Sequence, residues 1–76
     1  MNNWNNLYND INTILNNEIK HLNDNLEELE NIEKERKLKD DEIKYKNQLR
    51  GAIFELYTIK SMLVDLKEEK ENNGNE

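Results

Sequence analysis

The chain has 76 residues, of which 37% are charged and 34% hydrophobic, and its net charge is −6. A chain of this length forms one small domain and buries little of its surface. The absence of cysteine excludes disulfides and zinc sites built from thiolates. The longest aliphatic run, Met62-Leu63-Val64, is far shorter than the roughly 20 apolar residues of a membrane-spanning helix. The N-terminus lacks a signal-peptide pattern, so we expect a cytoplasmic protein that does not bind membranes.

The first half of the chain has the apolar spacing of an amphipathic helix. Apolar residues recur every three or four positions, which places them on one helix face, at Trp4, Tyr8, Ile11, Leu15, Ile19, Leu22, Leu26 and Leu29. Leu7, Ile14 and Ile32 flank this series. The pattern predicts a helix over about residues 4–37, with an asparagine near its start as the cap.

A cation-rich run is followed at once by a run of acids, Lys34-Glu35-Arg36-Lys37-Leu38-Lys39 and then Asp40-Asp41-Glu42. Cations stabilise the C-terminal end of a helix and acids the N-terminal end. The order predicts a turn at about residues 36–41, with Asp40 or Asp41 capping the next helix. One continuous helix is the alternative, because the chain has no proline. Apolar residues are sparse between residues 33 and 48, which favours the turn.

The second half of the chain repeats the helical pattern more regularly. A heptad series, with steps of four and three residues, runs through Tyr45, Leu49, Ala52, Leu56, Ile59, Leu63 and Leu66. Further apolar residues lie outside the series, at Ile53, Phe54, Tyr57, Met62 and Val64. The pattern predicts a helix over about residues 41–71 that packs against more than one neighbour, followed by a frayed tail at residues 72–76.

Together these patterns predict an all-α fold, a single domain formed by an antiparallel two-helix hairpin. Because a hairpin of this size has a thin core, we expect it to self-associate, as a dimer that forms a four-helix bundle or coiled coil. The predicted oligomer core consists of the central apolar residues of both helices, Leu15, Ile19, Leu22, Leu26, Leu29, Leu49, Ala52, Leu56, Ile59, Leu63 and Leu66.

The pairing of the two helices suggests where a partner binds. A turn near residue 40 pairs residues whose numbers add up to about 80, and a turn near residue 36 gives about 72. In either register the aromatic and aliphatic residues nearest the N-terminus lack a full apolar match on the second helix. Unmatched aromatic anchors are typical of interface hot spots. We therefore predict a partner-binding patch of Trp4, Leu7, Tyr8 and Ile11; fraying of these residues, or a longer second helix, is the alternative.

Charge is unevenly distributed along the chain. Residues 1–33 carry one cation and seven acids, residues 34–50 seven cations and four acids, and residues 51–76 three cations and six acids. The turn is therefore the basic end of the hairpin. Phosphate binding requires a positive surface, and here acids interrupt the basic region of an acidic protein. Nucleic-acid binding through residues 34–50 is the alternative function, and an unidentified protein partner is the preferred one.

Residues with catalytic chemistry are few. Glu18 and His21 have the Glu-x-x-His spacing of carboxylate-bridged metal bundles, but the chain has a single histidine. Ser61 is the only serine, which leaves no nucleophile triad, and no glycine-rich phosphate loop is present. We therefore expect no enzyme activity, no metal and no cofactor.

The segment from Arg50-Gly51-Ala52-Ile53-Phe54-Glu55-Leu56-Tyr57 to Leu66 resembles the C-terminal helices of small, mostly uncharacterised phage and mobile-element proteins of AT-rich Gram-positive bacteria. The resemblance covers about a quarter of the chain and transfers no functional residue. It implies a small accessory protein that modulates a partner. The expected function is that of a non-enzymatic interaction protein, an adaptor or inhibitor.

Overall fold

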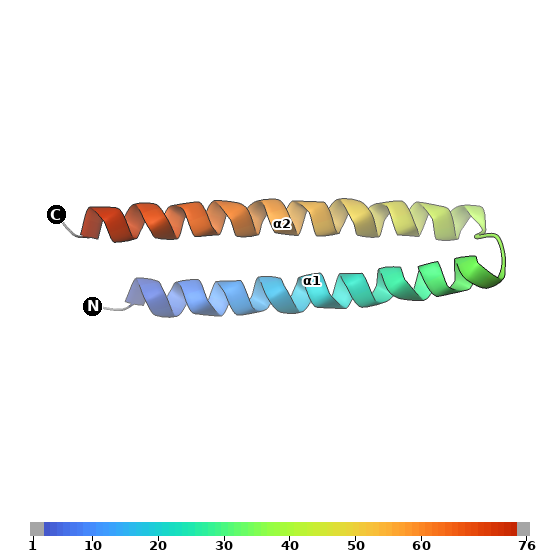
Figure 1. Ribbon diagram of the computed structural model, residues 1–76, viewed down its shortest axis with the longest axis horizontal. Helices are drawn as coiled ribbons and strands as arrows, with labels where there is room; N and C mark the ends of the chain where they lie inside the picture. Colours follow the sequence, from blue (N-terminus) through green and yellow to red (C-terminus); the bar gives the residue numbers. More distant parts are fainter. Residues whose placement is uncertain (1–2, 75–76) are drawn as a thin grey trace.

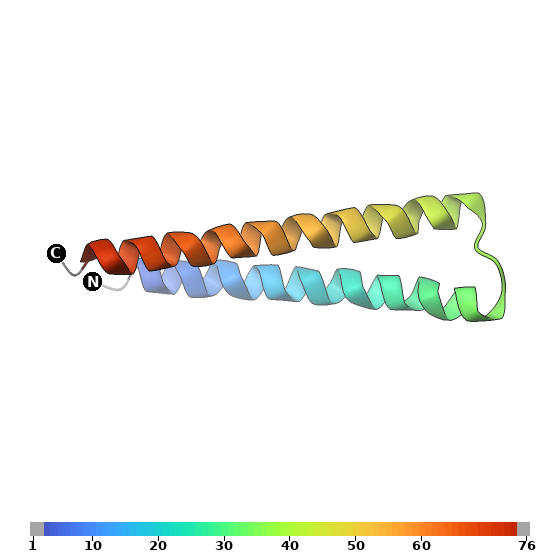
Figure 2. The same cartoon turned by 45° about the horizontal axis from the view of Figure 1, so that its top comes forward.

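The computed structural model describes residues 3–74 and shows an antiparallel helical hairpin (Figure 1). Helix α1 spans Asn3–Glu35 and helix α2 spans Asp40–Gly74. The hairpin measures 59 × 16 × 15 Å, with both chain ends on the side opposite the turn. Seen after a 45° rotation, the helices cross at a shallow angle (Figure 2). The predicted all-α hairpin is therefore confirmed.

The helix ends differ from the expected ones by a few residues. The turn is shorter than the expected 36–41, because α1 ends at Glu35 and α2 begins at Asp40. Helix α2 also continues through residues 72–74, where a frayed tail was expected. Lys67 and Glu71 form an i,i+4 ion pair of 3.4 Å near this end, which supports the last turns of the helix. Residues 75 and 76 of the expected tail lie outside the described residues.

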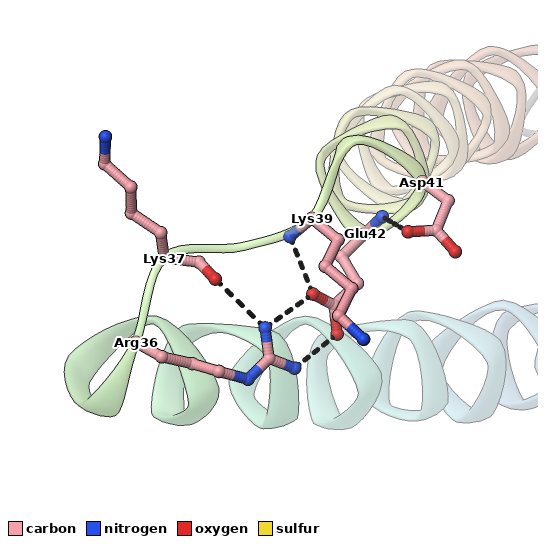
Figure 3. A network of polar contacts seen from close by, with 5 residues as sticks. All are labelled: Arg36, Lys37, Lys39, Asp41 and Glu42. Carbon is pink, nitrogen blue, oxygen red and sulfur yellow. Dashed lines mark hydrogen bonds and ion pairs between the residues drawn. The ribbon is translucent and has the colours of Figure 1, made fainter.

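Helix α2 is capped differently from the prediction. Its first backbone hydrogen bond runs from the Ile43 N–H to the Lys39 carbonyl, which makes Lys39 the N-cap. The Glu42 carboxylate reaches back and accepts the Lys39 N–H at 2.8 Å, which is half of a capping box (Figure 3). Asp41 accepts the Glu42 N–H at 3.0 Å. Neither Asp40 nor Asp41 is therefore the N-cap residue, although the Asp41 carboxylate accepts an N–H of the first turn and Glu42 accepts the N–H of the N-cap itself.

Arg36 joins the two helices across the turn. Its guanidinium donates two hydrogen bonds to Glu42, Nη1 to Oε1 at 2.9 Å and Nη2 to Oε2 at 2.8 Å, and Nη1 also donates to the Lys37 carbonyl (Figure 3). The hydrogen bonds from Arg36 and from the Lys39 N–H lower the pKa of Glu42 from 4.5 to about 2. The hydrogen bond with Glu42 in turn raises the pKa of Arg36. The turn is thus held by a bidentate ion pair.

The core is a narrow seam between the helices. Among the described residues, the buried apolar side chains are Leu15, Ile19 and Leu29 of α1 and Leu49 and Leu63 of α2. Residues seven apart lie on nearly the same side of a helix, and Leu15, Leu22 and Leu29 have this spacing, as do Leu49, Leu56 and Leu63. Of the described side chains, none is less than 2% exposed. Both helices therefore bury one stripe, and the stripe is thin.

Polar contacts fix the register of the two helices. Lys46 Nζ lies 2.6 Å from Glu33 Oε1, and Lys60 Nζ donates to Asn16 Oδ1 at 2.7 Å. Lys67 Nζ lies 4.8 Å from the centroid of the Tyr8 ring, and Lys70 Nζ lies 5.9 Å from that of Trp4. The residue numbers of these partners add up to between 74 and 79, which lies between the two registers expected from the sequence.

The ion pair of Arg36 and Glu42, which we call the clamp, makes the stability of the fold depend on pH in the acid range. Because the folded-state pKa of Glu42 is about 2 and its ordinary value is 4.5, its stabilising effect is complete above pH 4.5 and is lost as the pH falls through about 2. We expect Glu42→Gln to unfold at a lower temperature than the wild type at neutral pH, and this difference to shrink on acidification. Thermal unfolding followed by circular dichroism across this pH range measures it.

The control variant is Glu28→Gln, which removes a carboxylate that forms no ion pair among the described residues. Its unfolding temperature should follow that of the wild type throughout the acid range. If Glu42→Gln behaves as this control does, the ion pair at the turn does not stabilise the fold.

Candidate functional site

The Lys60–Asn16 hydrogen bond marks one edge of the seam between α1 and α2. Neighbouring residues of a helix point about 100° apart. Ile14 and Asn16 therefore lie on opposite sides of the buried Leu15. Ile59 and Lys60 come three and four residues after Leu56, so they lie on opposite sides of the row formed by Leu49, Leu56 and Leu63. Since Asn16 and Lys60 meet at one edge, Ile14 and Ile59 lie at the opposite edge of the hairpin.

This opposite edge carries an exposed surface that we call the apolar face. It consists of three residues from each helix, Leu7, Ile11 and Ile14 of α1 and Ile59, Met62 and Leu66 of α2. Within each helix, every residue of the face lies within one or two turns of the next. The observed register of the two helices places the three α1 residues beside the three α2 residues. The exposed fractions are 65% for Ile14, 63% for Met62, 51% for Leu7, 47% for Ile59 and 40% for Leu66, and Ile11 is half-buried.

Carboxylates bound the apolar face. Glu18 follows Ile11 by seven residues and therefore continues its row toward the turn. Glu55 and Glu69 lie seven residues before and after Met62, in the same row of α2. All three are exposed, and none forms an ion pair among the described residues. The face is thus apolar in its centre and acidic at its rim.

The four residues of the predicted partner-binding patch do not share one environment. Leu7 is exposed and belongs to the apolar face, and Ile11 is half-buried beside it. Trp4 and Tyr8 are half-buried, with the ammonium groups of Lys70 and Lys67 over their rings. The expected lack of a full apolar match for these rings is not contradicted, because the partners on α2 are lysine side chains. Both lysines lie in the last turns of α2, from which their side chains reach across to the two rings of α1.

Most residues of the predicted oligomer core lie in the seam of the single hairpin. Five are buried there, and Leu22, Leu26, Ala52 and Leu56 are half-buried. Ile59 and Leu66 are exposed and belong to the apolar face. Tyr45, of the same heptad series, is also exposed but lies apart from them. A row of half-buried residues faces α1 in their place, Lys46, Ile53, Lys60 and Lys67. The single chain leaves the predicted dimer a prediction.

Sequence reasoning missed Ile14 and Met62 as members of an exposed surface. The available signal was the seven-residue spacing of Leu7 and Ile14, which places them in one row beside the helix seam. Met62 could be found in the same way, because it lies between Ile59 and Leu66 on the helix surface. These spacings become informative only when the rotation of each helix relative to the other is known.

The basic turn is partly neutralised within the chain. Arg36 is bound by Glu42, and Lys46 is 15% exposed at its side chain and bound by Glu33. Around these pairs, acidic side chains occupy the first turn of α2, at Asp40, Asp41 and Glu42. A hollow of about 410 Å³ at this end is lined by two acids, one cation and two apolar residues, Glu33, Asp40, Lys37, Leu38 and Ile43.

Metal-ligating side chains do not converge in the described part of the chain. Glu18 and His21 are both exposed. Within residues 3–74 no three His, Cys, Asp or Glu side chains come close enough to share an ion. In the same residues, neither helix carries a stretch long and apolar enough to cross a bilayer.

Comparisons of the chain with protein families, with curated proteins and with solved structures found no match. The implied relation to phage and mobile-element proteins therefore stays a prediction.

The adjacent residues Ile14 and Leu15 test the placement of the apolar face. Leu15 is 8% exposed, so Leu15→Ala should lower the free energy of unfolding by about 2–5 kcal/mol. Ile14 is 65% exposed, so Ile14→Ala should change it by no more than about 0.5 kcal/mol. Urea denaturation of both variants measures the difference, and a large loss for Ile14→Ala would mean that this side chain belongs to the core.

Proposed function

We propose that this protein is a non-enzymatic interaction module, an adaptor or inhibitor that acts by binding a partner protein through its apolar face. The observation that carries the proposal is the gathering of large apolar side chains from both helices on one edge of the hairpin. Five of them are 40–65% exposed. Contiguous exposed apolar surface on a small protein is typical of interaction sites.

The hairpin cannot cover this face by itself. Each helix has one neighbour, and α1 and α2 already use their contact stripes to bury Leu15, Ile19, Leu29, Leu49 and Leu63. Covering the apolar face requires a third helix or another surface. Complete burial of a Leu, Ile or Met side chain contributes about 1.5–3 kcal/mol, from which the cost of association is subtracted. The five residues are 40–65% exposed, so covering each of them contributes part of this free energy.

A partner helix would lie along the apolar face, between Ile14 and Met62. It would convert the hairpin into a three-helix arrangement, in which the apolar residues of α2 contact two neighbours instead of one. The broad apolar surface of α2 that the sequence shows fits this arrangement. A protein that binds in this way acts by occupying a surface of its partner or by holding it in place.

Nucleic-acid binding through residues 34–50 has weaker support. Two of the seven cations in this segment, Arg36 and Lys46, are bound by carboxylates of the same chain. The net charge of −6 opposes the approach of phosphate groups. We therefore favour a protein as the partner.

Site-specific photocrosslinking in the cell that makes the protein tests the proposal. Benzoylphenylalanine at position 62 places the reactive group on the apolar face, and we expect it to form covalent adducts with another protein chain. The matched control is position 57, because Tyr57 is 51% exposed and lies across the α2 stripe from Met62. Adducts at 62 and not at 57 support the proposal.

Absence of adducts at position 62, or equal yields at both positions, would contradict it. The mass of the adduct also identifies the kind of partner, because an adduct of two identical chains is a homodimer. The Ile14→Gln, Met62→Gln double variant, crosslinked through position 66, should lose the adduct without a loss of helicity.

A further inference from the structure

The charges around the apolar face differ from those on the rest of the terminal half of the hairpin, residues 3–20 and 55–74. Its rim carries Glu18, Glu55 and Glu69. The lysines of this half lie outside the rows of the face, and each has a partner among the described residues. Lys20 binds Asp24, Lys60 binds Asn16, and Lys67 and Lys70 lie over Tyr8 and Trp4. Three free carboxylates therefore lie at the rim, and the one lysine near the rows of the face is Lys70, whose ammonium lies over Trp4 in the row of Ile11.

A second copy of the chain fits this face poorly when the two terminal halves overlap. That arrangement covers apolar residues with apolar residues. It also brings Glu18, Glu55 and Glu69 of one copy close to the same carboxylates of the other. Juxtaposed like charges at an interface select against a pairing. Any apolar occupant can cover the apolar residues of the face, so the charges at its rim determine which occupant binds best.

An antiparallel second copy that overlaps along the full length meets the opposite difficulty. It sets the basic turn of one copy beside the acidic end of the other. However, three of the four rows of the apolar face become polar toward the turn, at Asn25, Glu28 and Gln48, while the row of Ile59 and Leu66 continues with Ala52 and Tyr45. This pairing would therefore set part of the apolar face against polar side chains. In each of the two pairings, a second copy leaves part of the apolar contacts or of the charges unsatisfied.

A hollow on α2 adds a specific feature at the edge of the face. It has a volume of about 380 Å³ and is lined by Phe54, Glu55, Thr58 and Ile59. Ile59 and Phe54 provide apolar walls, and Glu55 provides a carboxylate at the margin. A long side chain with an aliphatic stem and a cationic head matches both parts, as lysine and arginine do.

We propose that the occupant of the apolar face is an amphipathic helix of a partner protein, with an apolar stripe flanked by lysine or arginine. This inference rests on the proposed function, because it names the chemistry of the partner that the same face binds. The stripe packs between Ile14 and Met62, and the flanking cations meet Glu18, Glu55 and Glu69. Helix-in-groove recognition uses such i, i+3, i+4 and i+7 anchors.

A pair of designed peptides tests the charge requirement. Both are monomeric amphipathic helices with the same leucine stripe, and the flanking positions hold lysine in one and glutamate in the other. Neither contains tryptophan, so Trp4 fluorescence and calorimetry report binding to the full chain. We expect the lysine peptide to bind at least about tenfold more tightly than the glutamate peptide, and this preference to weaken with added salt.

Charge reversal at the rim is the decisive variant. Glu18→Lys, Glu55→Lys and Glu69→Lys together should reverse the preference between the two peptides. The matched control reverses three exposed acids outside the rows of the face, Glu27→Lys, Glu30→Lys and Glu68→Lys, and has the same net charge. The control should keep the wild-type preference, which separates the local effect of the rim from the overall charge.

The remaining outcomes distinguish this inference from the proposed function. Equal binding of both peptides, abolished by Ile14→Gln with Met62→Gln, would overturn the charge requirement and retain the binding face. If neither peptide binds, and light scattering shows a dimer that the same double variant dissociates, a second copy covers the face and the basic helix is excluded. If neither peptide binds and the chain is monomeric, both the inference and the proposed function fail.

Discussion

The rotation of α2 about its own axis determines which of its apolar residues are buried and which are exposed. That rotation is already defined in the first turn of the helix, where Arg36 holds Glu42 against the end of α1. Glu42, Leu49, Leu56 and Leu63 follow one another at seven-residue intervals, so a helix that directs Glu42 toward α1 directs these leucines there too. An exposed ion pair contributes little free energy. The clamp therefore orients α2, and the buried leucines supply the stabilisation.

Because of this rotation, a row with three lysines faces α1, and Ile59 and Leu66 face outward. Lys46, Lys60 and Lys67 are half-buried, and the ammonium group of each has a partner. Lys46 binds Glu33, Lys60 donates to Asn16, and Lys67 lies over the Tyr8 ring. Their aliphatic stems cover apolar surface within the seam, and their ammonium groups reach its edge. The hairpin thereby completes its own seam with amphipathic side chains and leaves a set of purely apolar ones exposed.

The sequence was sufficient to predict the hairpin, the position of the turn to within a few residues, and the centre of the core. Leu15, Ile19, Leu29, Leu49 and Leu63 were all predicted as residues of the oligomer core, because they belong to the apolar series of their helices, in which apolar residues recur every three or four positions. The exposure of Ile59 and Leu66 was not predictable in this way. On either side of the α2 leucines lies a row with heptad spacing, one with Ile59 and Leu66 and the other with Lys60 and Lys67. The prediction placed the more apolar row against α1 and neglected that the aliphatic stems of lysine can also cover apolar surface. Trp4 and Tyr8, for which no full apolar match was expected, have the ammonium groups of Lys70 and Lys67 over their rings.

The first and last described residues of the chain, Asn3 and Gly74, lie at the same end of the 59 Å hairpin (Figure 1). Leu7 of the apolar face is about one turn of helix from that end, and Leu66 is about two turns from it. A fluorescent protein or an affinity tag fused at either terminus would therefore stand beside the face and obstruct large partners. The segment between Glu35 and Asp40 is at the far end. An insertion there places a bulky reporter where it leaves the face open, provided that it spares Arg36 and the Lys39 N–H that Glu42 binds.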